Sequence, residues 1–276
     1  MSSRKGFRRF MCSRRGLAVP VTYLILFCSL LAIVSATYAL SIRQVSVSGA
    51  AFGVAVAKQN MQCLDEAVQL VAWNTGAAKT VFMEDCGGVF QVQPNAKNIV
   101  LRLTDGGGFS SEVFNGLVGK ALYTFNALPE SQEGLFVRGD GRAIVGQGVS
   151  TMTQLYFARN GSLQQLVLCY RPMATALAAS LSSGKPVNII RIYILNVSAL
   201  QPLMLSGSFK PKVSTVNVAS TVQSFTFDWA VSSLAVEAYS EGVQTTLRLP
   251  IESTVEGAVI NLETYVCHIN IQVVGS

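Results

Sequence analysis

The chain has 276 residues, of which 50% are hydrophobic and only 13% are charged, and its formal net charge is +6 at pH 7. Six of its 21 Lys and Arg residues precede residue 17, and the other 15 balance the 15 Asp and Glu residues. The basic charge thus belongs to the N-terminal segment. The remaining cations are scattered, so no nucleic acid partner is expected.

An apolar run follows these cations directly. Residues 17–42 contain no charged side chain, and about 20 apolar residues in a helix suffice to cross a bilayer. No acidic residue occurs before Asp65. The excess of cations predicts a cytoplasmic segment over residues 1–16 and a transmembrane helix over 17–42. The predicted location is the cell membrane, crossed once, with the N-terminus in the cytoplasm and the C-terminal domain outside.

A helical repeat continues beyond the apolar run, over residues 43–76. Apolar or small residues recur in alternating steps of three and four, which is typical of a helix with one packing face. This apolar seam comprises Val47, Ala50, Val54, Ala57, Met61, Leu64, Val68 and Val71. Asp65 falls off the seam, and Asn74-Thr75-Gly76 is expected to end the helix. The seam packs either on the chain's own β domain or on other chains, and both alternatives stay open.

From residue 79 onward the pattern changes to short runs rich in β-branched and aromatic residues, among them 99–104, 187–197 and 264–274. The pairs Asn160-Gly161 and Asp140-Gly141 each predict a tight hairpin. Residues 172–184 are expected to form a loop or one short helix. The predicted fold class is α+β: a long N-terminal helix, then a mainly antiparallel, β-sandwich-like external domain over residues 77–276, with an internal boundary near 180–186.

The chain offers little for catalysis or metal binding. His268 is the only histidine, and no paired metal-ligand spacing accompanies it. Neither a nucleophile motif nor a phosphate-binding or dinucleotide-binding loop occurs. We therefore expect no catalytic residues, no metal, no cofactor and no enzymatic activity. Arg138-Gly139-Asp140 spells an adhesion tripeptide, but a turn is the preferred interpretation.

Cysteines and glycosylation motifs fit an external domain. Four cysteines lie in the predicted external part: Cys63, Cys86, Cys169 and Cys267. In an oxidising compartment they favour up to two disulfides, and the alternative is that they are buried thiols. The two Asn-x-Ser motifs make Asn160 and Asn196 candidate glycosylation sites.

The sequence Arg14-Arg15-Gly16-Leu17, followed by the apolar run, resembles the class III signal peptide of archaeal type IV pilin-like proteins. In that family a prepilin peptidase cuts after the glycine and before the hydrophobic segment. The resemblance implies cleavage between Gly16 and Leu17, a helix that packs with sister pilin-like subunits in a filament core, and a β-rich head. It implies as partners the membrane, the prepilin peptidase and sister subunits, in a minor or pseudo-pilin component of a surface filament or appendage.

Two alternatives remain open. The first is an unprocessed, signal-anchored cell-surface protein that binds a ligand or partner through its β domain. The second is a secreted protein with an ordinary signal peptide, cut after Thr37-Tyr38-Ala39. The mature N-terminus distinguishes all three interpretations.

Overall fold

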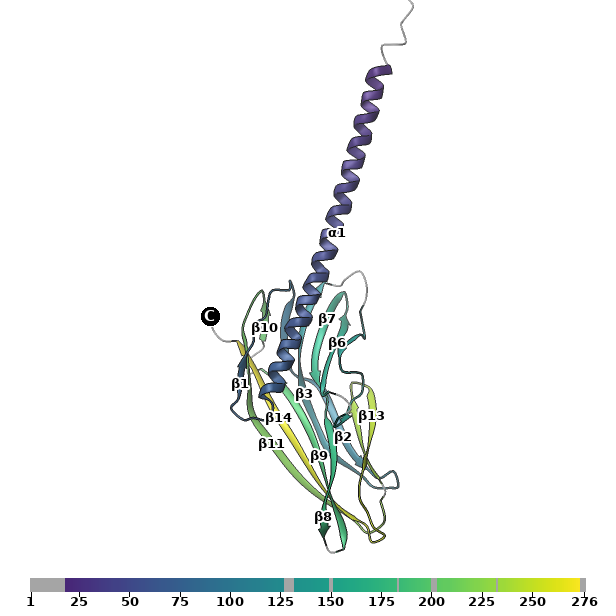
Figure 1. Ribbon diagram of the computed structural model, residues 1–276, viewed down its shortest axis with the longest axis vertical. Coiled ribbons are helices and arrows are strands. Elements are labelled where there is room, and N and C mark those ends of the chain that lie inside the picture. The colour runs from purple at the N-terminus through teal and green to yellow at the C-terminus, as the bar shows by residue number, and fades with distance from the viewer. Residues whose placement is uncertain are drawn as a thin grey trace, which may run out of the picture. The chain divides into compact units, whose positions relative to one another are not determined.

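A computed structural model describes residues 18–126, 132–148, 151–182, 184–199, 203–231 and 233–273. The chain divides into two compact units, Met1–Ala50 and Ala51–Ser276. One long apolar helix leads into a mostly β domain (Figure 1), which agrees with the predicted α+β class.

The helix α1 spans Ala18–Val71. It ends before the predicted stop near residue 76, because the chain reverses at Trp73, which has a φ of 68°. A non-glycine residue thus takes the left-handed position that follows the helix. The hydroxyl of Thr215 donates to the Val71 carbonyl oxygen at 2.6 Å, which satisfies one of the last polar groups of the helix.

The strands form two sheets. The first is six-stranded, in the order β1 (Ala78–Thr80), β11 (Pro211–Phe227), β14 (Ala258–Val273), β9 (Lys185–Ser198), β8 (Met173–Ser182) and β5 (Val145–Gly146). The second is eight-stranded, in the order β13 (Val243–Pro250), β12 (Ser233–Ser240), β2 (Val89–Thr104), β3 (Ser110–Asn126), β7 (Leu163–Tyr170), β6 (Thr153–Asn160) and β4 (Phe136–Arg138), with β10 (Leu203–Ser206) also paired to β2. Most pairs are antiparallel, whereas β9–β14 and β5–β8 are parallel.

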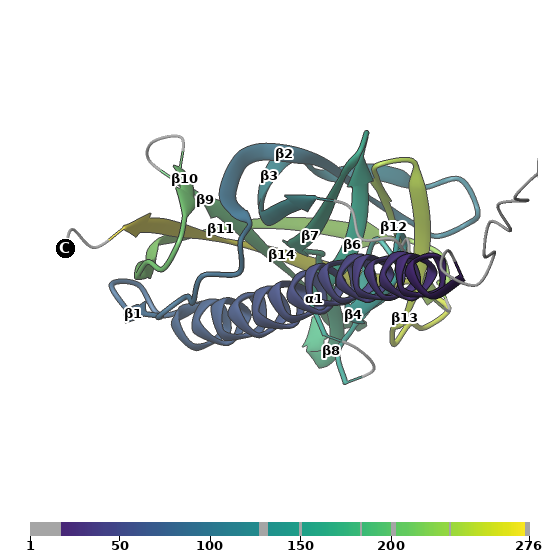
Figure 2. The same cartoon turned by 90° about the horizontal axis from the view of Figure 1, so that it is seen from above.

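Side chains of the two sheets meet in a shared core. Ile99 and Leu101 of β2 belong to the same buried cluster as Ile190 of β9 and Ile260 of β14. Figure 2 shows β2 and β3 on one side of β11 and β14. The alternation of buried and less buried residues along β9, β12 and β14 follows from the period of two in a strand.

A second core cluster seats the end of α1. Met61 and Leu64 are fully buried there. The same cluster includes Phe90 of β2 in the eight-stranded sheet and Ile269 of β14 in the six-stranded sheet. The last turns of the helix therefore contact both sheets and form part of the hydrophobic core of the β domain.

Several local predictions are wrong or need adjustment. Residues 173–182 form strand β8 rather than a loop or helix, because they pair with β9. The segments on either side of Asp140-Gly141 do not pair with each other; β4 pairs with β6, and β5 with β8. The β6–β7 hairpin exists, but its two-residue loop is Gly161-Ser162, since Asn160 pairs with Leu163. Its first loop residue, Gly161, has a φ of 60°, as a type II′ turn requires.

The predicted internal boundary near residues 180–186 falls within a hairpin. Ser182 at the end of β8 pairs with Lys185 at the start of β9. Residues on both sides belong to the single compact unit Ala51–Ser276. The structure thus joins the two segments that the boundary would have separated.

Two helical glycines allow a matched test of packing. A Cβ atom at Gly53 would lie 2.6 Å from the carbonyl oxygen of Cys86, whereas one at Gly49 would meet nothing within 4 Å. We expect Gly53→Ala to lower the free energy of unfolding by about 1–3 kcal/mol through overpacking. Gly49→Ala is expected to be neutral or stabilising by up to about 1 kcal/mol, because alanine favours the helix. Thermal unfolding of both variants checks this, and equal shifts would contradict the close approach at Gly53.

Candidate functional site

The first candidate surface is the exposed apolar helix between residues 20 and 50. Every side chain in this stretch is exposed, including Leu24, Leu26 and Ile33 at 64%, 59% and 66%. The helix is long and apolar enough to cross a membrane. Ser29 and Thr37 donate to backbone carbonyls within the helix, at 2.8 and 2.6 Å, so their hydroxyls are satisfied without water.

The predicted cleavage residues Arg14, Arg15, Gly16 and Leu17 lie outside the described residues. The apolar seam is split by the structure. Val47 and Ala50 are exposed, whereas the other six members are buried against the chain's own strands: Val54, Ala57, Met61, Leu64, Val68 and Val71. Of the two alternatives for the seam, packing on the β domain therefore accounts for its C-terminal six positions.

Asp65 holds the helix to the β domain through a buried polar network. Its side chain is fully buried and accepts hydrogen bonds from Arg138 Nη1 (2.7 Å), Thr153 Oγ1 (2.7 Å), Tyr170 Oη (3.0 Å) and Gln69 Nε2 (3.0 Å). Burial, together with the adjacent carboxylate, raises the pKa of Tyr170 well above its ordinary value. The phenol therefore stays protonated and donates. Asp65 lies one position off the apolar seam, so the periodicity alone gave no sign of its burial.

The charged side chains of the tripeptide Arg138-Gly139-Asp140 form ion pairs within the protein. Arg138 pairs with Asp65, and Asp140 pairs with both Arg142 and Arg171. Hydrogen bonds from Arg142 and then Arg171 hold the pKa of Asp140 well below its usual range. Arg171 is fully buried and also donates to backbone carbonyls of the same loop. These contacts fix the loop that follows β4.

The cysteines of the β domain are free thiols. Cys63, Cys86, Cys169 and Cys267 are each unpaired, so the predicted disulfides are absent. Cys169 and Cys267 are fully buried, and burial raises the pKa of both thiols. They behave as small hydrophobic residues, which is the alternative that the sequence left open.

The two candidate glycosylation sites differ. Asn160 is exposed beside the β6–β7 turn, so its side chain is accessible to a glycan. Asn196 is an interior residue of β9, and its side-chain Oδ1 accepts a hydrogen bond from the Gly119 N–H at 3.0 Å. Its amide also faces His268 Nδ1 at 3.5 Å. The structure thus argues against a glycan at Asn196.

The most distinctive polar feature is a pocket around Lys97, with a volume of about 180 Å³. Lys97 follows an irregularity in the pairing of β2 with β3. Gln93 and Lys97 lie four residues apart on β2, but their partners on β3, Lys120 and Val118, lie only two residues apart. Asn95 within this irregularity has a φ of 55°. Such bulges redirect side chains, and here the lysine side chain is turned inward and buried.

The ammonium group of Lys97 has few partners. Its Nζ donates to Gln154 Oε1 at 3.0 Å and approaches Cys169 Sγ at 3.9 Å. None of the ion pairs among the described residues includes Lys97. Gln154 is held in this orientation because its Nε2 donates to the carbonyls of Asp140 and Arg142, at 2.7 and 3.2 Å. The loop after β4 therefore orients the acceptor for the buried lysine.

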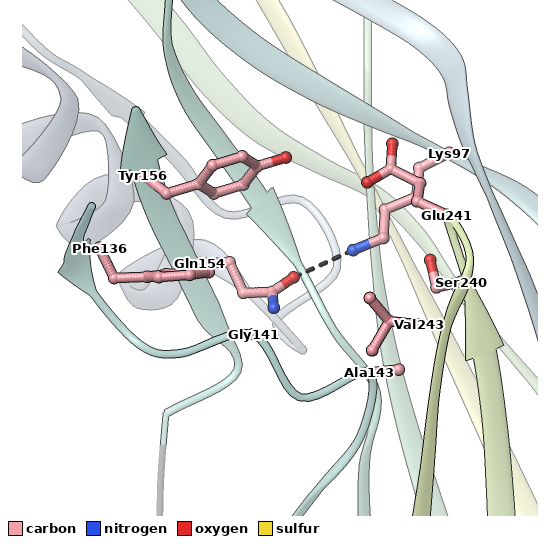
Figure 3. Close-up of a pocket in the computed structure, with 9 residues that line it drawn as sticks. All are labelled: Lys97, Phe136, Gly141, Ala143, Gln154, Tyr156, Ser240, Glu241 and Val243. Carbon is pink, nitrogen blue, oxygen red and sulfur yellow. Dashed lines mark hydrogen bonds between the residues drawn. The ribbon is translucent and has the colours of Figure 1, made fainter. Parts of the chain in front are cut away.

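Figure 3 shows the other walls of this pocket. The aromatic rings of Phe136 and Tyr156 lie on one side, with centroids 5.3 Å apart. The side chain of Glu241 lies on the same side as Lys97. Glu241 has a φ of 49° in the Glu241-Gly242 turn that joins β12 to β13. The hydroxyl of Ser240 donates to the Asn98 carbonyl at 3.0 Å, which ties this turn to β2 beside Lys97.

Other polar features have structural explanations. The Asp105 carboxylate accepts from the N–H groups of Gly107, Gly108 and Phe109, so it closes its own glycine-rich turn. A second pocket, of about 260 Å³, adjoins the Asp65 network, and the hydroxyls of Thr153 and Tyr170 that line it already bind Asp65. Within the described part of the chain, no group of three His, Cys, Asp or Glu residues is placed to hold a metal ion.

Sequence reasoning missed Lys97, Glu241 and Asp65. Two signals were present: Pro94-Asn95 interrupts a long β-type run, and Glu241-Gly242 is a turn pair. Neither signal indicates that Lys97 and Glu241 line the same pocket. No protein-family model, curated protein or solved structure matches this chain.

Proposed function

We propose that this protein is a membrane-anchored, type IV pilin-like component of an archaeal surface filament or appendage, and that it is not an enzyme. The observation that carries the proposal is the contrast within α1. Its C-terminal turns are buried in the β domain, whereas every residue from 20 to 50 is exposed. An exposed apolar helix of this length requires either lipid or other helices around it. Before assembly a lipid bilayer surrounds the exposed part of the helix, and in the filament sister helices surround it.

The proposed topology places residues 1–16 in the cytoplasm and the β domain outside the cell. The six N-terminal cations support this orientation by the positive-inside rule. They also favour cleavage between Gly16 and Leu17, by the resemblance to class III signal peptides. Cleavage removes these cations, so the helix no longer carries charges that resist movement through the hydrocarbon region.

N-terminal sequencing and intact-mass measurement of the protein extracted from its native membrane test this proposal. We expect the mature chain to begin at Leu17. Gly16→Trp, which places a large ring at the cleavage position, is expected to leave the chain uncut, while Gly49→Ala serves as a matched control at a distant glycine. A wild-type chain that retains Met1 or Ser2 would contradict the pilin-like proposal, and a start at Leu40 would instead support simple secretion.

The second candidate function is a signal-anchored surface protein that binds a ligand through its β domain without processing. The Lys97 pocket is the specific observation that favours it, because a buried ammonium faces an open space there. An uncut N-terminus together with saturable ligand binding would support this alternative.

A further inference from the structure

We propose that the pocket between Lys97 and Glu241 binds a small zwitterion of the α-amino acid type. The ligand's carboxylate would accept hydrogen bonds from the Lys97 ammonium, and its own ammonium would donate to the Glu241 carboxylate. This inference does not depend on whether the chain is cleaved or assembles into filaments.

The first argument is the unmet bonding capacity of Lys97. The residue is only 5% exposed, and burial of an ammonium group costs free energy unless charged or polar partners replace water. An ammonium has three N–H donors. One of them meets the neutral amide oxygen of Gln154 at 3.0 Å, and the closest other partner is the thiol sulfur of Cys169 at 3.9 Å. At least one donor is thus left for an acceptor in the pocket.

The second argument is the position of Glu241, which carries the one carboxylate among the described residues that line the pocket. Glu241 and Lys97 line the same space, yet none of the ion pairs among the described residues joins them. A ligand in this space would therefore lie beside both charges. Glu241 also disfavours ligands with only negative charge, because a second anion beside it is repelled. A molecule with one charge of each sign is complementary to this pair of side chains.

The third argument concerns the size and the lining of the pocket. A volume of about 180 Å³ is below the range of about 300–1,000 Å³ of pockets that hold drug-sized ligands. The pocket therefore suits a small molecule, and alanine is the probe chosen for the test. Phe136, Tyr156 and Val243 supply apolar surface for a short side chain. Burial raises the pKa of Tyr156, so its hydroxyl is neutral and adds no further charge.

The test uses the full-length protein in lipid nanodiscs, titrated with L-alanine and followed by calorimetry and by ligand-observed NMR. We expect saturable binding of one L-alanine per chain. Acetate and methylammonium, which each carry only one of the two charges, are expected to bind roughly tenfold or more weakly, because each loses one charge-assisted hydrogen bond. Equal binding of acetate and L-alanine would overturn the zwitterion assignment, and the absence of saturable binding would overturn the site.

Variants of Lys97 and Glu241 test whether these two side chains bind a ligand or only stabilise the fold. Lys97→Met and Glu241→Gln should each weaken L-alanine binding roughly tenfold or more. The controls Lys79→Met and Glu256→Gln remove the same charges from exposed positions and should bind as the wild type does. If Lys97→Met does not fold, Glu241→Gln carries the test, because Glu241 is exposed at a turn. Wild-type affinity in a folded pocket variant would overturn the proposal.

Discussion

Replacing Asp65 by alanine is expected to lower the free energy of unfolding of the β domain by about 3 kcal/mol. The change leaves the buried hydroxyls of Thr153 and Tyr170 without their acceptor. It also removes the ion-pair partner of Arg138, whose side chain is 38% exposed and can turn to water. Breaking a buried ion pair lowers the free energy of unfolding by about 3–5 kcal/mol. Because Arg138 is partly exposed, we expect a loss at the low end of this range.

Chemical denaturation of the full-length protein in detergent micelles measures this effect. Glu66→Ala is the matched control, because Glu66 is the next residue of the same helix and is exposed. Its expected effect is within about 0.5 kcal/mol. If the two variants unfold at the same denaturant concentration, Asp65 does not fasten the helix.

The second large effect is expected from charges in the exposed apolar helix. Leu26→Arg combined with Leu30→Arg places two cations within the predicted membrane span. Each costs about 2.5–3.5 kcal/mol near the centre of a bilayer, so the pair is expected to cost about 5–7 kcal/mol. The double variant should be lost from carbonate-washed membranes. In the proposed filament the same charges would also prevent close packing of sister helices, so we expect no filaments in electron micrographs.

The control for this experiment is Gln44→Arg combined with Ser48→Arg, which has the same spacing but lies beyond the uncharged run. It should retain both membrane association and assembly. Normal membrane retention of the Leu26 and Leu30 double variant would show that lipid does not surround this part of the helix.

The sequence predicted those parts of the fold that depend on local patterns. The alternating steps of three and four placed α1 and identified the six seam residues that are buried. The β-type runs around residues 99, 187 and 264 correspond to β2, β9 and β14. In each case the period of the side chains reflects which face is buried, so the pattern carries the structural information by itself.

The errors arose where distant partners decide the local structure. The segment Met173–Ser182 contains four alanines and two leucines, residues with a high helix propensity, yet pairing with β9 makes it a strand. Trp73 replaces the expected glycine after the helix because its ring packs edge-on against Tyr193, with centroids 5.2 Å apart. The β8–β9 pairing and the Trp73–Tyr193 contact each depend on a partner segment that local propensity does not take into account.

The candidate pocket could not be predicted for the same reason. Lys97 and Glu241 are far apart in the sequence, and they meet because β12 pairs antiparallel with β2, with Ser240 opposite Ile99. The bulge that turns Lys97 inward depends on the register between β2 and β3. A single sequence shows the bulge residues and the turn residues, but it does not show which strands become neighbours.

The way α1 enters the β domain also has a mechanical consequence. Asp65 bonds to β6 and β7 of the eight-stranded sheet, while the Val71 carbonyl bonds to Thr215 of β11 in the six-stranded sheet. Tension applied through the helix would therefore load both sheets together, and these bonds would have to break at the same time as Met61 and Leu64 leave the core. Resistance to pulling depends on the rate of forced unfolding rather than on equilibrium stability. The helix end would thus pass a pulling force on α1 to both sheets of the β domain at once.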